Sequence, residues 1–116
     1  MTQRSVTFTK EQIAEYADAS GDRNPIHVDD DFARTVGLPG IIAHGMLQMG
    51  LMATVAADAA GRPDRIRRLY CRFAGMVLPG DTVTFSAEPA GTGRLELRAL
   101  NQRGEPVLTK SIAEVD

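Results

Sequence analysis

The segment HGMLQMGLMATVAADAA, residues 44–60, forms the longest apolar region of the chain and contains no proline. Its only polar interior residues are Gln48, Thr54 and Asp58, so a helix here is apolar around most of its circumference. This pattern predicts a helix that is buried on nearly all sides. Glycine is unfavourable in helices, so Gly45 and Gly50 indicate close packing or a backbone that a ligand approaches. For Gly50, simple tolerance of glycine is also a reasonable interpretation.

Strand-like sequence dominates the chain after this helix. Four runs rich in β-branched and apolar residues, IRRLYCRFAGMVL, DTVTFSAEP, RLELRALNQ and PVLTKSIAEV, are separated by PGD, AGTG and RGE turns. The AGTG and RGE spacers predict successive antiparallel hairpins, and the runs together predict a meander of four strands. RSVTFT, residues 4–9, predicts a short first strand. The fold class expected is α+β, with an antiparallel sheet packed against one long helix.

The region before the long helix carries local helix signals. Thr9 and Gln12 have capping-box spacing, which predicts a helix from Thr9 to about residue 19 that stops at Gly21. Residues 22–28 are expected to form a loop with a turn at Asn24-Pro25. Asp29 or Asp30 can cap a short helix over residues 31–36 that ends at residue 37.

Composition sets broad limits on what the chain does. Its 116 residues, 43% hydrophobic and 24% charged, predict one folded domain, residues 1–116. The net charge of -2 gives the chain no general attraction to nucleic acid or to an anionic membrane. The single cysteine, Cys71, cannot form an internal disulfide and fits a reducing, cytoplasmic setting. No apolar segment suitable for a signal peptide or a membrane span is evident, so neither secretion nor membrane insertion is expected.

The loop SGDRNPIHVDDDF, residues 20–32, is the candidate site for proton transfer. Asp22 and His27 are a carboxylate and an imidazole, and the turn between them can direct both side chains into one pocket. Such acid–histidine pairs in turns also occur without catalysis. The three consecutive acids at residues 29–31 are adequately explained as helix caps. A calcium loop is not expected, because the twelve-residue pattern lacks its closing glutamate. Asn24 is best interpreted as a structural residue of the turn that also fixes Asp22 or His27.

Residues 16–51, YADASGDRNPIHVDDDFARTVGLPGIIAHGMLQMGL, resemble the MaoC-like hydratases of the hot-dog fold. That family comprises (R)-specific enoyl-CoA hydratases and (3R)-hydroxyacyl thioester dehydratases. GDRNPIH and IAHGML resemble its two signature blocks, and RFAGMVLPGDTV is similar to the strand-turn-strand that follows them. The resemblance implies an antiparallel sheet wrapped around one long buried central helix. It also implies a hydro-lyase without metal or cofactor, whose substrate carries coenzyme A or phosphopantetheine. Family members often begin with an additional strand, of which this chain has only a stub.

The resemblance also implies roles for particular residues. Asp22 and His27 would be the catalytic dyad that holds the water, with Asp22 as the base in hydration and His27 as the acid, or the reverse. The first N–H groups of a helix have no internal partners, so the Gly45 N–H is a candidate donor to the thioester carbonyl oxygen. His44 is either a second acid or a hydrogen-bonded structural residue. Apart from the resemblance, further candidate substrate contacts are Asn24, Ile42 at the lip, Met46 in an acyl tunnel, and Arg65 and Arg67. Ile42 is equally well explained as an apolar anchor of its loop, and Met46 as a core residue of the helix.

The arginines have a second interpretation. Arg65 and Arg67 belong to a basic cluster with Arg62 and Arg68, and such a cluster is usually a solvated strand end. The functional alternative is a grip on the coenzyme A phosphates or a contact for an acidic carrier protein.

The resemblance implies pairing through the sheet, as a homodimer or as a heterodimer with a related hot-dog subunit. Two other functions are open. The chain could be a non-catalytic subunit that binds acyl chains or stabilises a partner, although the presence of both dyad residues argues against this. It could be a hot-dog acyl thioesterase, although the carboxylate expected on the buried helix is not evident, because Asp58 lies near the wrong end.

Overall fold

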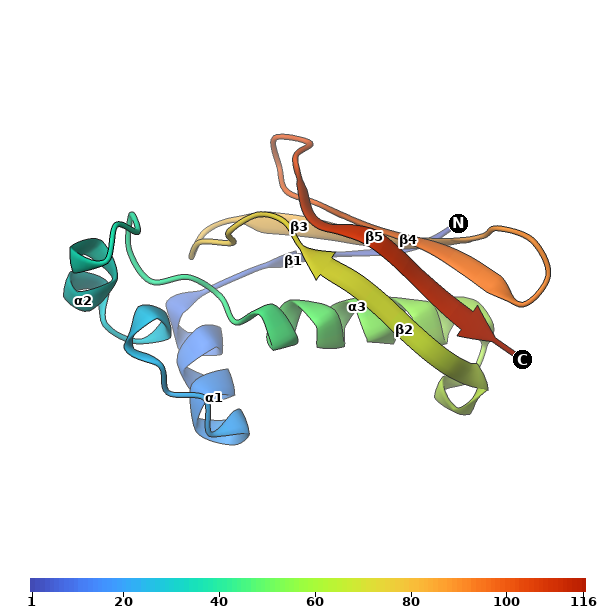
Figure 1. Cartoon of the computed structure of the whole chain (residues 1–116), viewed down its shortest axis with the longest axis horizontal. Helices are drawn as coiled ribbons and strands as arrows, with labels where there is room; N and C mark the ends of the chain where they lie inside the picture. Colours follow the sequence, from blue (N-terminus) through green and yellow to red (C-terminus); the bar gives the residue numbers. More distant parts are fainter.

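A computed structural model describes all 116 residues of the chain. Its elements in chain order are β1 (Thr2–Thr7), α1 (Lys10–Ser20), the 3₁₀ turn η1 (Pro25–His27), α2 (Asp30–Thr35), α3 (Gly45–Ala60), a second 3₁₀ turn η2 (Pro63–Arg65), β2 (Ile66–Phe73), β3 (Thr82–Pro89), β4 (Arg94–Leu100) and β5 (Pro106–Val115). The five strands form one sheet that lies along one side of α3 (Figure 1). The predicted α+β class, with an antiparallel sheet packed against a long helix, is confirmed.

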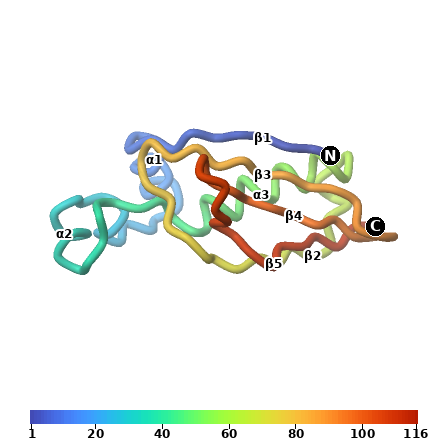
Figure 2. The backbone as a smooth tube through the Cα atoms, turned by 90° about the horizontal axis from the view of Figure 1, so that it is seen from above, coloured from blue at the N-terminus to red at the C-terminus, as the bar shows by residue number.

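The strand order in the sheet is β1-β3-β4-β5-β2, and every neighbouring pair is antiparallel (Figure 2). The two predicted hairpins, β3 with β4 and β4 with β5, are confirmed. The prediction of a four-strand meander is wrong, because β2 pairs with β5 and not with β3. After β2, the N–H groups of Ala74 and Gly75 both donate to the Val107 carbonyl. The chain therefore passes beside the start of β5 before it returns as β3 on the other side of β4.

The first strand, β1, is a fully paired strand of the sheet and not a short remnant. β1 pairs with β3 along its whole length, from Thr2 opposite Ala87 to Thr7 opposite Thr82. Hydroxyl pairs between Ser5 and Thr84 and between Thr7 and Thr82 support this register, each at 2.8 Å. The stub expectation is therefore wrong, and the strand begins two residues earlier than predicted because its pairing with β3 continues to Thr2.

The helix caps of the first half agree with the sequence. The Thr9 hydroxyl accepts the Gln12 N–H at 3.0 Å, and Gly21 ends α1 in the left-handed conformation with φ 79°. Asp29 caps α2 by accepting the Phe32 N–H at 3.1 Å, so α2 begins at Asp30, one residue earlier than predicted. These contacts are local in sequence, and local patterns predict them well.

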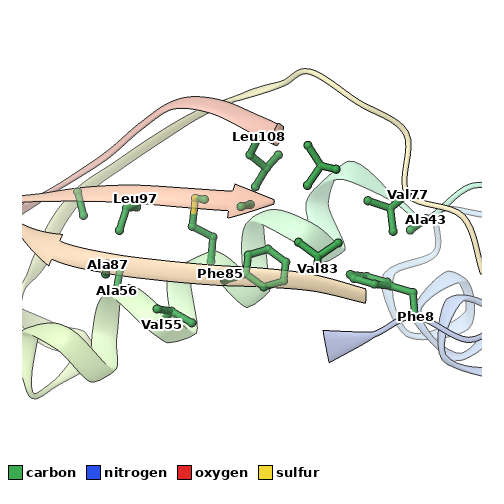
Figure 3. Close-up of a cluster of buried hydrophobic side chains, with 14 of the residues drawn as sticks. Phe8, Ala43, Val55, Ala56, Val77, Val83, Phe85, Ala87, Leu97 and Leu108 are labelled. Atoms are coloured by element: carbon green, nitrogen blue, oxygen red, sulfur yellow. The ribbon is translucent and has the colours of Figure 1, made fainter. Parts of the chain in front are cut away.

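The core lies between the sheet and one face of α3. Figure 3 shows Val83 and Phe85 of β3 in this layer above α3, with Phe8 at the end of the cluster near Val77, and all of these side chains are almost fully buried. The opposite face of α3 is open, with Met46 59% exposed. The prediction that α3 is buried on nearly all sides is therefore wrong for a single chain, because five strands cover only one face of the helix. None of the helices has both the length and the apolar character needed to span a membrane.

Candidate active site

An open pocket of about 360 Å³ lies at the N-terminal end of α3. The loop before η1, the first turn of α3 and the segment after β2 form its walls. Its polar side chains belong to Asp22, His27 and Gln48, and its apolar side chains include Ile42, Met46, Phe73 and Met76. The pocket therefore combines proton-carrying groups with an apolar lip.

A short turn brings Asp22 and His27 together. The Asn24 side chain accepts the Ile26 N–H at 3.2 Å, and its own backbone N–H donates to the Asp22 carboxylate at 3.3 Å. Pro25 starts the 3₁₀ turn that ends at His27. One potential ligand atom each from Asp22, His27 and His44 lies within 4.8 Å of the others. Asn24 itself does not line the pocket, so in this structure its contacts are those of a turn residue.

A backbone carbonyl fixes the tautomer of His27. The imidazole is 8% exposed, and its Nδ1 lies 2.7 Å from the Ile42 carbonyl oxygen. A carbonyl can only accept, so Nδ1 carries the hydrogen. In the neutral ring Nε2 is then an unprotonated acceptor, and in the charged ring it is a donor. Any proton that His27 exchanges with a substrate therefore passes through Nε2.

His44 lies behind this pair. It is 1% exposed, and its Nε2 donates to the Asp22 carbonyl oxygen at 2.9 Å. Its ring stacks on His27 with centroids 3.8 Å apart, and Tyr16 contacts it edge-on at 4.8 Å. His44 is absent from the pocket lining. These contacts are those of a residue that holds the Asp22 backbone and the His27 ring in place.

Gly45 is the first residue of α3, and the preceding His44 makes no side-chain capping hydrogen bond. The first N–H groups of the helix therefore have no partner within the helix and carry the positive end of its dipole. A Cβ on Gly45 would lie 3.0 Å from a ring carbon of Phe73, so glycine allows the aromatic ring to sit against the backbone. This end of α3 can receive an oxygen that becomes negatively charged.

The same three groups do not fit a metal held by both histidines. Although the ligand atoms of Asp22, His27 and His44 are close, the two imidazole planes are stacked with an angle of 22° between them. A cation in the plane of one ring would lie well outside the plane of the other, whereas a histidine ligand directs its lone pair within the ring plane. The arrangement is better suited to proton transfer.

The structure does not bring Arg65 and Arg67 to this pocket within one chain. Arg65 donates to the carbonyl of Ala60, the last residue of α3, at 2.7 Å. That residue is roughly 22 Å along the helix from Gly45 at 1.5 Å per residue. The Arg67 Nε lies 2.6 Å from an oxygen of Asp116, and this contact raises the pKa of Arg67 and lowers the pKa of Asp116. By contrast, Ile42 and Met46 do line the pocket.

Sequence reasoning did not identify Gln48, Phe73 and Met76 as pocket residues. Gln48 had a usable signal, because it is a lone polar residue in the first turns of an apolar helix. Phe73 and Met76 had none, because their position depends on the path of β2 and the segment after it beside the start of α3.

A single antiparallel sheet packed on one long helix is the arrangement of the hot-dog fold. Residues 1–110 match the family model described as "MaoC like domain", and the chain belongs to that family. It is similar in structure to the R-hydratase PhaJ1 from Pseudomonas aeruginosa, with a TM-score of 0.78 and 30% identity over 97% of this chain and 76% of that one. It is also similar to the (R)-hydratase from A. caviae, with a TM-score of 0.81 and 26% identity over 96% of this chain and 89% of that one.

Related sequences include much longer proteins. The chain is 31% identical over 110 residues to a peroxisomal hydratase-dehydrogenase-epimerase from Neurospora crassa, and the aligned region covers 95% of this chain and 12% of that protein. It is 38% identical over 89 residues to fatty acid synthase subunit beta from Saccharomyces cerevisiae, and the aligned region covers 73% of this chain and 4% of that protein. The chain thus spans only a small part of these relatives.

Proposed function

We propose that this chain is an (R)-specific hydro-lyase that adds water to trans-2-enoyl thioesters and removes it from (3R)-hydroxyacyl thioesters. The observation that carries the proposal is the position of Asp22 and His27 in one pocket beside the uncapped start of α3. The names of the structural relatives, both (R)-hydratases, support the same reaction.

In the hydration direction, the Asp22 carboxylate takes a proton from water while the water oxygen bonds to C3 of the enoyl group. The electron pair of the double bond moves toward the thioester, and negative charge grows on the carbonyl oxygen. A charged His27 then gives its Nε2 proton to C2. A proton passing from Asp22 to His27 restores both groups, and their proximity supports this transfer. Dehydration follows the same steps in reverse.

The carbonyl oxygen would lie against the Gly45 N–H. A fixed N–H donor that meets the oxygen where charge develops stabilises the transition state more than the ground state. The helix dipole acts in the same direction. The residues that this mechanism uses all belong to the chain, and coenzyme A or phosphopantetheine enters only as the carrier of the substrate.

His44 acts in this proposal as a positioning residue and not as a second acid, because its contacts are with Asp22 and His27. Met46 and Ile42 are proposed to contact the acyl chain at the pocket lip. Substrate contacts by Asn24, and by Arg65 and Arg67 with the phosphates of the carrier, stay predictions. The arginines in one chain lie at the other end of α3 from the pocket.

The free edge of β2 supports pairing with a second hot-dog chain. β2 has only β5 as a neighbour, and Tyr70 and Phe73 on it are 39% and 55% exposed. Exposed apolar side chains on an unpaired strand favour association through that edge. A structural neighbour at 23% identity is described as the ChsH1-ChsH2 complex from Mycobacterium tuberculosis, with a TM-score of 0.84 over 100% of this chain and 93% of that chain. We propose a homodimer, with a heterodimer as the alternative; light scattering of the purified chain should give twice the monomer mass.

The direct test is the loss of enoyl absorbance from crotonyl-CoA, together with chiral analysis of the product. The proposal predicts hydration to the (3R)-hydroxy product. A folded chain that binds the thioester without turnover would be the non-catalytic subunit, and release of free thiol would identify a thioesterase. The thioesterase has little structural support, because Asp58 on α3 pairs with Arg4 at 2.9 Å and does not line the pocket.

A further inference from the structure

Gln48 is a buried polar side chain that the mechanism above does not use. It is 3% exposed, and its Oε1 is fully covered with no hydrogen-bond partner in the chain. The side chain nevertheless forms part of the pocket wall. Buried carboxamides are normally hydrogen-bonded, because burying one without a partner is unfavourable. The covered Oε1 is an acceptor and cannot pair with a carbonyl oxygen, so the atom of this carboxamide that can meet a substrate carbonyl is its donor, Nε2.

The carboxamide belongs to the same end of α3 as the proposed oxyanion donor. Gln48 lies three residues after Gly45, and side chains of an α-helix lean toward its N-terminus. The side chain therefore leans over the first turn, where the N–H groups have no helical partner. Nε2, the donor of this group, has no hydrogen-bond partner either, and unlike Oε1 it is not among the fully covered atoms.

The substrate has two oxygens near the reacting carbons that need partners. The oxygen at C3 is the water oxygen from which Asp22 takes a proton in the proposed function. The thioester carbonyl oxygen has two lone pairs, and the Gly45 N–H satisfies only one of them. Gln48 is the remaining polar side chain of the pocket wall.

We propose that the Gln48 carboxamide donates the second hydrogen bond to the thioester carbonyl oxygen, so that the oxyanion site has one backbone donor and one side-chain donor. This assignment rests on the proposed function. The side-chain donor strengthens its bond as negative charge grows on the oxygen, and it thereby acts on the chemical step more than on binding.

Gln48→Leu removes the donor with little change in volume. The chain offers a matched control in Gln12→Leu, because Gln12 of α1 also has a covered, partnerless Oε1 but does not line the pocket. Loss of one oxyanion donor lowers kcat on the order of 100-fold or more. We expect that loss for Gln48→Leu, with KM changed only a few-fold, and nearly wild-type kcat for Gln12→Leu. Neither variant should lower the melting temperature, because each exchanges an unsatisfied polar group for an apolar one.

A spectroscopic readout identifies the atom that Gln48 contacts. Butyryl-CoA labelled with ¹³C at the carbonyl cannot be hydrated, and its C=O stretch falls when hydrogen bonds polarise the bond. We expect a lower stretch when it is bound to the wild-type protein than to Gln48→Leu, and no difference between the wild type and Gln12→Leu. Gln48→Met replaces Gln48→Leu if the latter does not fold.

A wild-type kcat in Gln48→Leu would overturn this assignment. So would an unchanged C=O stretch, even with a reduced kcat, because Gln48 would then act on the water or the C3 oxygen. A wild-type protein that hydrates no enoyl thioester would instead overturn the proposed function. In that case, the C=O stretch of bound butyryl-CoA still tests the carbonyl contact separately.

Discussion

The Gly45→Ala variant should slow catalysis in the pocket and change the stability of the folded protein only slightly. A Cβ at this position would lie 3.0, 3.1 and 3.2 Å from three ring carbons of Phe73. Carbon atoms pack best at about 3.5–4.0 Å, so the ring must retreat by roughly 0.5–1 Å. Phe73 borders the open pocket, and its ring can move toward that space. Alanine is favoured over glycine by about 0.5–1 kcal/mol inside a helix, and the gain is smaller at the first helical position, which Gly45 occupies. The net change in unfolding free energy should stay within about 1 kcal/mol, or roughly 5 °C in melting temperature.

Activity should respond far more strongly than stability. In the proposed mechanism, the added methyl group would occupy the space through which the substrate carbonyl approaches the Gly45 N–H, and the displaced ring would change the pocket wall. Losing one oxyanion contact costs about 2.7–4 kcal/mol, which corresponds to roughly 100- to 1000-fold in kcat. We therefore expect Gly45→Ala to melt near the wild-type temperature and to hydrate crotonyl-CoA at least about 100 times more slowly.

Gly50→Ala is the matched control within the same helix. A Cβ there would meet nothing within 4 Å, so the substitution should add about 0.5–1 kcal/mol of stability and leave hydration unchanged. Thermal melts and the enoyl absorbance assay measure both quantities on both variants. Wild-type kcat in Gly45→Ala would refute the role of this N–H. Loss of folding in Gly45→Ala would refute the reasoning that Phe73 can move.

Two further variants test the contacts that hold the site. The Lys10 ammonium and the Ile41 N–H donate hydrogen bonds to the Asp30 carboxylate and lower its pKa below the usual 3.8. The ionised carboxylate therefore stabilises the fold at neutral pH, and this stabilisation is lost as the pH falls through the lowered pKa. Asp30→Asn should therefore melt below the wild type near neutral pH, and the gap should close in melts recorded well below pH 3.8; a gap that persists there would contradict the ionic origin. His44→Phe keeps a ring in place but removes the donor to the Asp22 carbonyl, so denaturant unfolding should show a loss of about 1–3 kcal/mol. Its kcat should fall more than its KM rises, and unchanged kinetics would remove the positioning role.

The parts of the fold that the sequence predicted depend on contacts between residues close in the chain. Thr9 caps α1, Gly21 ends it, and the Asn24-Pro25 turn brings Asp22 and His27 together within a few residues. The hairpins that join β3, β4 and β5 are equally local. Capping, turn and hairpin preferences act over this range, so one sequence is enough to infer them.

The parts that the sequence did not predict depend on contacts between distant segments. The place of β2 beside β5 is set by pairing between residues about forty positions apart, such as Tyr70 with Ile112. Phe73 reaches Gly45 only because of this path. The apolar pattern of α3 indicated a buried helix but not which face the sheet would cover, because that depends on the number and order of the strands. Gln48 stood out as polar, yet only the structure shows that its side chain borders the pocket.

The measurement that tests the central claim most directly compares Asp22→Asn, His27→Ala and the double variant in the hydration of crotonyl-CoA. If Asp22 and His27 act together on one water, each single variant should have a kcat at least about 100-fold below that of the wild type. The double variant should then be hardly slower than the slower single variant, because the second substitution removes a group that no longer has its partner. Losses that multiply, or a folded single variant with nearly wild-type kcat, would contradict the account.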